Sequence, residues 1–176
     1  MNNLVQLAEL IKEKNVVDGK IASILGRPAQ VGHAGEYIAA ALLGIQLHQS
    51  ASHASSDGRF LQGPLTGRSV DIKWYLKHEG TLDLNPTTPP DYYFVLVGPK
   101  SASASSRGAV RPWVIESVFL FDASQILAVL RPRGIKLGIA TSVASELWIR
   151  AEIYPVQQNH VLTVDEAQRQ RLALFQ

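Results

Sequence analysis

The chain has 176 residues, which is enough to bury a sizeable core and short enough for one compact domain. Apolar residues make up 46% and charged residues 18%, a balance that excludes an intrinsically disordered protein, and the lack of cysteine excludes disulfides, zinc–thiolate sites and cysteine nucleophiles. The net charge of +2 permits a nucleic-acid partner without demanding one. We expect no membrane partner, because no run approaches the roughly 18 apolar residues that cross a bilayer. We also expect a cytoplasmic protein, because the acidic, amphipathic N-terminus resembles neither a signal nor a transit peptide.

The first part of the chain is predicted to be helical. Helical spacing of apolar residues predicts an amphipathic helix over 3–14 and a second helix over 17–25, which Gly26 and Pro28 end. A third helix begins near Gly35 and runs to Leu43, before Gly44. We therefore expect an N-terminal helical segment, residues 1–30, packed on an α/β domain of residues 31–176.

The rest of the chain is predicted to be rich in strands. Strands are expected at 45–48, 59–62, 69–77, 92–97, 113–121, 135–140 and 147–154, with helices at 123–130 and after a capping box at 163–166. The second and third of these strands are joined by residues 63–67 as a hairpin. The continuous apolar run 92–97 is typical of a central strand buried on both faces. This order of elements favours an α/β or α+β fold, a sheet covered by helices.

The strand 69–77 carries the residues of greatest chemical interest. Asp71 and Lys73 share one face of the strand, because side chains alternate between faces. If the hairpin is centred near Leu65, Asp57 lies opposite Lys73, and Arg59 lies opposite Asp71. Asp57, Asp71 and Lys73 then converge at one end of the hairpin. The alternative is a charged strand face that is turned to water without any function.

Two carboxylates beside an ammonium group suit metal-dependent phosphodiester hydrolysis. Carboxylates bind Mg²⁺, for which Mn²⁺ is a substitute, and the ion polarises the phosphoryl oxygen and lowers the pKa of a bound water. Glu36 adds a possible fourth member, because it shares a helical stripe with Ala40 and Leu43 and should face inward. A buried carboxylate needs a partner. Glu36 is therefore either paired with an arginine or lysine, or a further metal or water ligand.

Together these residues resemble the PD-(D/E)xK nuclease superfamily: a helix with Glu36, then Asp57 before a strand, then Asp71-Ile-Lys73 on the next strand. The resemblance covers roughly residues 34–97. It implies a restriction-endonuclease-like mixed central sheet flanked by helices, in which Glu36, Asp57 and Asp71 bind Mg²⁺ and Lys73 positions the attacking water. Ser56 stands where the family motif has proline. The dipeptide Pro90-Asp91 cannot supply that part of the motif, because it comes after Asp71-Ile-Lys73 in the chain.

The resemblance implies DNA as the partner and a metal-dependent endonuclease as the activity. Arg59, Arg68, Lys77 and His53 flank the predicted site and are the expected nucleic-acid contacts. A homodimer is expected because small nucleases of this kind commonly cut two strands as a pair. Two alternatives stay open. In one, the N-terminal helices, with a turn near 26–30, read the DNA duplex and the sheet is only a scaffold. In the other, a partner-binding domain keeps the nuclease-like fold without activity.

Overall fold

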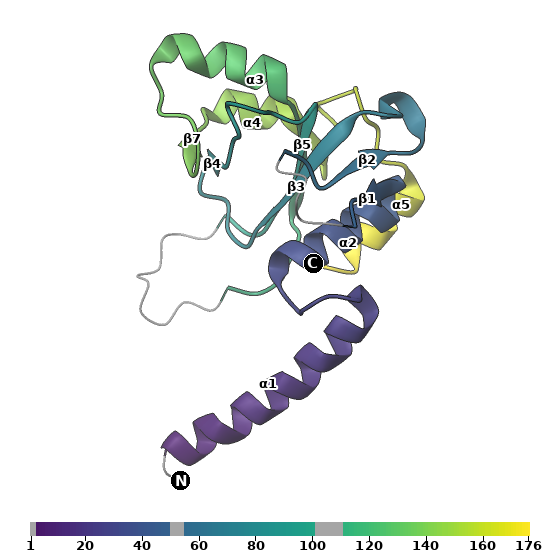
Figure 1. The fold of residues 1–176 in the computed structure, drawn as a ribbon, viewed down its shortest axis with the longest axis vertical. Helices are drawn as coiled ribbons and strands as arrows, with labels where there is room; N and C mark the ends of the chain where they lie inside the picture. Colours follow the sequence, from purple (N-terminus) through teal and green to yellow (C-terminus); the bar gives the residue numbers. More distant parts are fainter. Residues whose placement is uncertain (1–2, 50–54, 101–110) are drawn as a thin grey trace.

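The computed structural model describes residues 3–49, 55–100 and 111–176, and shows a mixed central sheet flanked by helices (Figure 1). His53, one of the expected nucleic-acid contacts, lies outside the described residues. The helices are α1 (Asn3–Leu25), α2 (Val31–Leu43), α3 (Ala123–Leu130), α4 (Ser145–Ala151) and α5 (Glu166–Ala173). The strands are β1 (Ile45–Leu47), β2 (Gly58–Phe60), β3 (Ser69–Tyr75), β4 (Thr81–Leu82), β5 (Tyr92–Val97), β6 (Ser117–Asp122), β7 (Thr141–Ser142) and β8 (Glu152–Tyr154).

The central sheet has six strands in the order β1-β2-β3-β5-β6-β8, and β4 pairs separately with β7. The first three strands form an antiparallel meander, β5 runs parallel to β3, and β6 and β8 are again antiparallel to their neighbours. Strand β5 is buried on both faces, as its apolar run predicts. Phe94 belongs to the core on one face of the sheet, whereas Val95 belongs to the core on the other.

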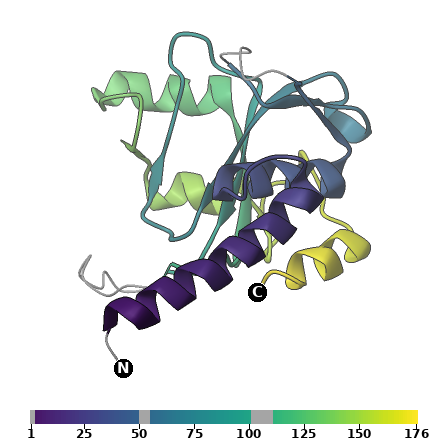
Figure 2. The same ribbon diagram turned by 60° about the horizontal axis from the view of Figure 1, so that its bottom comes forward.

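The two faces of the sheet are covered by different elements (Figures 1 and 2). Helices α2 and α5 pack on the face that carries Val70, Ile72 and Trp74 of β3. Helices α3 and α4, together with the short β4–β7 sheet, contribute to the core on the opposite face. Asp71 and Lys73 alternate with the first set along β3, and so they point toward the second face.

The N-terminal segment differs from its prediction. It forms one helix, α1, instead of two, because nothing at Asn15 or Val16 breaks a helix, and Gly26 ends it with a φ of 66°. No residue of α1 is buried. Only its C-terminal end lies against α2, and the rest projects from the body of the protein (Figure 1). The expected packing of residues 1–30 on the core is therefore limited to the last turns of α1.

Some later elements also differ. Residues 147–154, predicted as one strand, are the end of α4 followed by β8, because Leu147, Trp148 and Ala151 follow helical spacing. Residues 135–140, all of them described, form no strand, and positive φ angles occur just before this stretch at Gly134 and within it at Gly138 and Ala140. Strand β6 begins at Ser117, later than predicted. The capping box of α5 uses Asp165 and Gln168, two residues further along the chain than the predicted pair.

Candidate functional site

The meander brings Asp57 to Asp71. Gly58 pairs with Val70, and Arg59 pairs with Ser69, so the hairpin register differs by two residues from the predicted one. A shift of two residues keeps every side chain on its predicted face, because strand side chains alternate with a period of two. Asp57, Asp71 and Lys73 therefore still share a face, but the residue opposite Asp57 is Asp71 instead of Lys73.

The Asp57 side chain continues the strand pairing where the ladder between β2 and β3 ends. Its backbone N–H donates to the carbonyl of Val70 at 2.9 Å, and its Oδ2 accepts from the backbone N–H of Ile72 at 2.6 Å. Gly58 helps to fix this position, because a Cβ there would lie 2.4 Å from the carbonyl oxygen of Gln46 on β1. The close approach of β1 thus holds the backbone that presents the Asp57 carboxylate.

Asp71 is the most perturbed carboxyl group near the site. Burial raises its pKa from 3.8 to about 7, Lys73 opposes that rise, and the neighbouring carboxyl of Asp57 adds to it. Lys73 Nζ lies 2.8 Å from Asp71 Oδ1, and the exposed fractions of the two side chains are 29% and 15%. The carboxyl group of Asp57 lies close enough to raise the pKa of Asp71, both through its charge and through a side-chain hydrogen bond. Partly buried acids with a perturbed pKa and a charged partner recur at functional sites.

Beside this cluster, two tyrosine hydroxyls bind the backbone of residues 83–85. The hydroxyl of Tyr75 accepts from the backbone N–H of Asp83 at 2.8 Å, and that of Tyr93 accepts from the N–H of Asn85 at 2.8 Å. Burial raises the pKa of both tyrosines. Sequence reasoning put Tyr75 on the polar face of β3 but missed this role. The alternation along β3 and β5 was the available signal, whereas no local pattern predicts that residues 83–85, eight positions from each tyrosine, return to meet the hydroxyls.

Glu36 is not brought to this cluster. It forms an ion pair with Arg27, and it lies on α2, the helix that covers the opposite face of the sheet. In the three described stretches of the chain, no group of three or more acidic, histidine or cysteine residues could hold a metal ion. Of the two alternatives expected for Glu36, the structure therefore shows the pair with an arginine. Asp57 and Asp71 are the two carboxylates that could share an ion.

The three expected nucleic-acid contacts that are described, Arg59, Arg68 and Lys77, each have a partner within the chain. Arg59 donates from Nη1 to the carbonyl of Gly67 at 2.9 Å, across the hairpin turn. Arg68 pairs with Asp91 at 3.2 Å, and Lys77 pairs with Glu79 at 3.3 Å. These cations border the hairpin and the end of β3, so they lie on the elements that carry Asp57 and Asp71.

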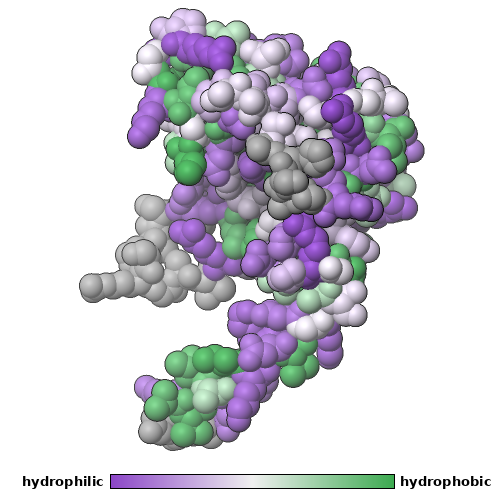
Figure 3. Space-filling view, in the orientation of Figure 1, coloured by the Kyte–Doolittle hydropathy of each residue, from purple (hydrophilic) through white to green (hydrophobic). Residues whose placement is uncertain are grey.

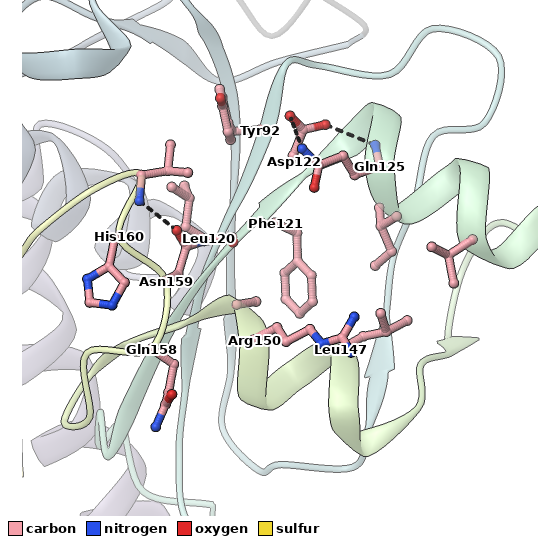
Figure 4. Close-up of a pocket in the computed structure, with 14 residues that line it drawn as sticks. Tyr92, Leu120, Phe121, Asp122, Gln125, Leu147, Arg150, Gln158, Asn159 and His160 are labelled. Carbon is pink, nitrogen blue, oxygen red and sulfur yellow. Dashed lines mark hydrogen bonds between the residues drawn. The ribbon is translucent and has the colours of Figure 1, made fainter.

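A separate pocket of about 410 Å³ lies between β6, α3, α4 and the loop around residue 159 (Figure 4). The ring of Phe121 lies at its centre, with Asp122 and Gln125 on one side and Arg150 on the other, while His160 lies at the edge, on the loop. Asp122 is the N-cap of α3 and accepts from the backbone N–H of Gln125. This pocket was not foreseen from the sequence, because residues 147–154, which include Arg150, were expected to form a strand. Neither Asp71 nor Lys73 lines it.

None of the described helices is both long enough and apolar enough to span a membrane. Compared with known proteins, the chain matches no protein-family model and no curated sequence, so the site has to be interpreted from its own geometry.

Proposed function

We propose that the chain is a Mg²⁺-dependent nuclease of the restriction-endonuclease-like type that hydrolyses phosphodiester bonds in DNA. The observation that carries the proposal is the cluster of Asp57, just before β2, with Asp71 and Lys73 of β3 on the same face of the sheet. Burial and the neighbouring Asp57 raise the pKa of Asp71 to about 7. The order of elements supports it: helix α2, then Asp57 before β2, then Asp71 and Lys73 on β3, as in the family that the sequence resembles.

The two carboxylates suit a magnesium ion. Two like charges in contact are unfavourable, and a divalent cation between them would remove that cost. Mg²⁺ commonly binds through one or two carboxylates and keeps several waters, which agrees with a site of two acids. When bound, the ion would polarise the phosphoryl oxygen and lower the pKa of a bound water.

The protein's own groups have separate tasks in this proposal. Asp57 is held by the N–H of Ile72 and cannot turn away, so it fixes one side of the ion site. Asp71 supplies the second carboxylate once its proton has left. Lys73, partly exposed beside Asp71, orients the attacking water and offsets the charge that grows on the phosphate oxygens. Arg59, Arg68 and Lys77 border the cluster and would contact the DNA backbone.

The test is cleavage of plasmid and linear DNA by the purified protein with Mg²⁺ or Mn²⁺. We expect Asp57→Asn and Asp71→Asn, which remove groups that would hold the ion, and Lys73→Ala, which removes the group that would position the water, each to reduce the rate by about 100-fold or more. The matched control is Glu79→Gln, an exposed acid just beyond β3 that pairs with Lys77, which should cleave as the wild type does. A Mn²⁺ peak between Asp57 and Asp71 in soaked crystals would locate the ion.

The competing function is a DNA-binding or partner-binding domain that keeps this architecture without catalysis. The absence of a third acidic ligand among the described residues is the observation that favours it. Salt-dependent DNA binding that is insensitive to Lys73→Ala, with no cleavage of DNA under any divalent ion, would support this function and contradict ours.

A further inference from the structure

Helix α1 is the least integrated element of the fold. It spans Asn3–Leu25 without a single buried residue, and it projects from the body with its N-terminus at the far end (Figures 1 and 2). Its 23 residues correspond to a length of about 34 Å. In proteins most of the stability of a helix comes from packing of its apolar face. This helix has such a face, and among the described residues only those at its C-terminal end lie against the body.

The apolar face of α1 is a continuous stripe. Leu7, Leu10, Val17, Ile21 and Ile24 recur at alternating intervals of three and four residues, and Lys14 is the one polar member of the series. Leu7, Leu10, Val17 and Ile24 are all more than half exposed. The space-filling view shows apolar side chains gathered at the free end of the helix (Figure 3). Spacing of this kind is that of the a and d positions of a short coiled coil.

An apolar groove continues this stripe onto the body. It has a volume of about 510 Å³ and lies between α1, α2 and the C-terminal residues. Ile21 and Ile24 form its α1 wall, while Tyr37, Trp113 and Phe175 contribute to the rest. Together with the exposed stripe of α1, this groove forms a contiguous apolar surface, and such surfaces mark interaction sites.

The charges of α1 identify the occupant. The helix carries Glu9, Glu13 and Asp18 against Lys12, Lys14 and Lys20, so its net charge is zero. Helices that lie on membranes or along DNA carry an excess of basic residues, which α1 lacks. Glu13 and Lys20 lie on the same flank of the stripe, seven residues apart. In an antiparallel pair of identical helices, each Glu13 would meet the Lys20 of the other copy.

We propose that α1 pairs antiparallel with α1 of a second copy of this chain, with its free end seated at the apolar groove of that copy. Antiparallel pairing sets Leu7 against Ile24 and Leu10 against Ile21, so the exposed N-terminal half covers the groove wall. The same patch serves both copies, as a two-fold interface requires. This inference does not depend on the proposed nuclease activity.

Sedimentation of the full chain over a range of concentrations tests the pairing. We expect a dimer for the wild type and a monomer for Leu10→Glu, with unchanged cooperative unfolding of the body, because Leu10 is exposed and α1 has no buried residue. The matched control is Val5→Glu, which is similarly exposed but lies on the opposite side of α1 and should remain dimeric. A monomeric wild type, or a dimer that survives Leu10→Glu, overturns the proposal.

Two further variants test the direction of pairing. Glu13→Lys and Lys20→Glu should each weaken the dimer, and the double variant should restore it. Because the chain contains no cysteine, Leu7→Cys/Ile24→Cys introduces the only thiols. These are too far apart to bond within one helix. Oxidation should give the 7–24 linkage between copies, identified by peptide mapping, whereas a 7–7 linkage would show parallel pairing and refute the antiparallel interface.

Discussion

Two carboxyl groups beside β3 have opposite electrostatic environments. Asp91, just before β5, accepts hydrogen bonds from the backbone N–H and the hydroxyl of Ser69 and from Arg68, at distances of 2.7, 2.8 and 3.2 Å. Burial opposes its ionisation, but these donors outweigh it and hold its pKa below the usual value. Asp71, on the strand itself, is buried beside Asp57, and its pKa is raised to about 7 although Lys73 is near.

The difference separates a structural acid from a candidate functional one. The donors around Asp91 compensate its charge, so it joins the starts of β3 and β5 at a gain in stability. The surroundings of Asp71 make its charged form costly, and a protein gains nothing in stability from keeping it there. Ionisable residues whose pKa is perturbed in this way by their surroundings concentrate at functional sites.

The largest effect is expected for Asp71→Asn at alkaline pH. Because the folded-state pKa of Asp71 is above that of the unfolded chain, the native protein holds this proton more tightly. Its stabilising contribution is present below about pH 4 and is lost as the pH rises toward 7. A rise from 3.8 to about 7 corresponds to an upper limit of about 4 kcal/mol. We expect Asp71→Asn to be more stable than the wild type at pH 8, in urea unfolding, by a substantial part of that limit.

The same comparison at low pH provides the control. Near pH 4 the wild-type carboxyl is protonated and resembles the amide, so the two proteins should unfold at similar denaturant concentrations. If the advantage of Asp71→Asn is the same at pH 4 and pH 8, the charge of Asp71 is not its origin.

Binding of Mn²⁺ should give the next largest effect. A ligand at 100 times its Kd stabilises the native state by about 2.7 kcal/mol. Since the ion must displace the proton of Asp71, its affinity should fall by about tenfold for each pH unit below 7. We expect a clear rise of Tm with Mn²⁺ at pH 8 and almost none at pH 5, measured by calorimetry. An equal rise in the Asp57→Asn variant would show that the ion binds elsewhere.

A smaller effect of opposite sign is expected for Asp91→Asn. Its folded-state pKa is lowered, so its contribution to stability is present above about pH 4 and is lost as the pH falls through the folded-state value. Asp91 is about a third exposed, and solvent reduces the benefit. We expect a loss of about 1 kcal/mol at pH 7 in urea unfolding. A gain in stability, such as that expected for Asp71→Asn, would contradict the contrast between the two acids.

Much of the fold could be predicted from local patterns, because some elements have unambiguous ends. The continuous apolar run of β5 and the helix over 123–130 have the predicted bounds. The faces of β3 were also predictable, since a two-residue error in hairpin register leaves each side chain on the same face. The short stretch 147–154 was not, because a few apolar residues fit helical and strand spacing equally well.

The candidate site was predictable only where its partners are local. Asp57 and Asp71 meet across one hairpin, but their contact and the hydrogen bond to Ile72 depend on the turn at 63–67, whose geometry the sequence leaves open. The pairing of Glu36 with Arg27 depends on the turn between α1 and α2, and tertiary packing decides which face of the sheet α2 covers. The spacing of residues along the chain predicts neither the partner of Glu36 nor the face of the sheet that α2 covers.

The smallest effect is expected for Glu36→Gln, and it tests the assignment that the fold changed most. The Glu36 side chain is 16% exposed and its partner Arg27 is 43% exposed, and ion pairs of this kind contribute about 0–1 kcal/mol. If Glu36 serves only that pair, the substitution should lower stability by less than about 1 kcal/mol and leave both the Mn²⁺-induced rise of Tm and DNA cleavage unchanged. Arg27→Met is the matched variant, because it removes the pair from the other side and should give a similar loss. A loss of cleavage or Mn²⁺ binding with Glu36→Gln, but not with Arg27→Met, would return Glu36 to the ion site as the sequence resemblance implies, and would mean that α2 moves relative to β3 when the ion binds.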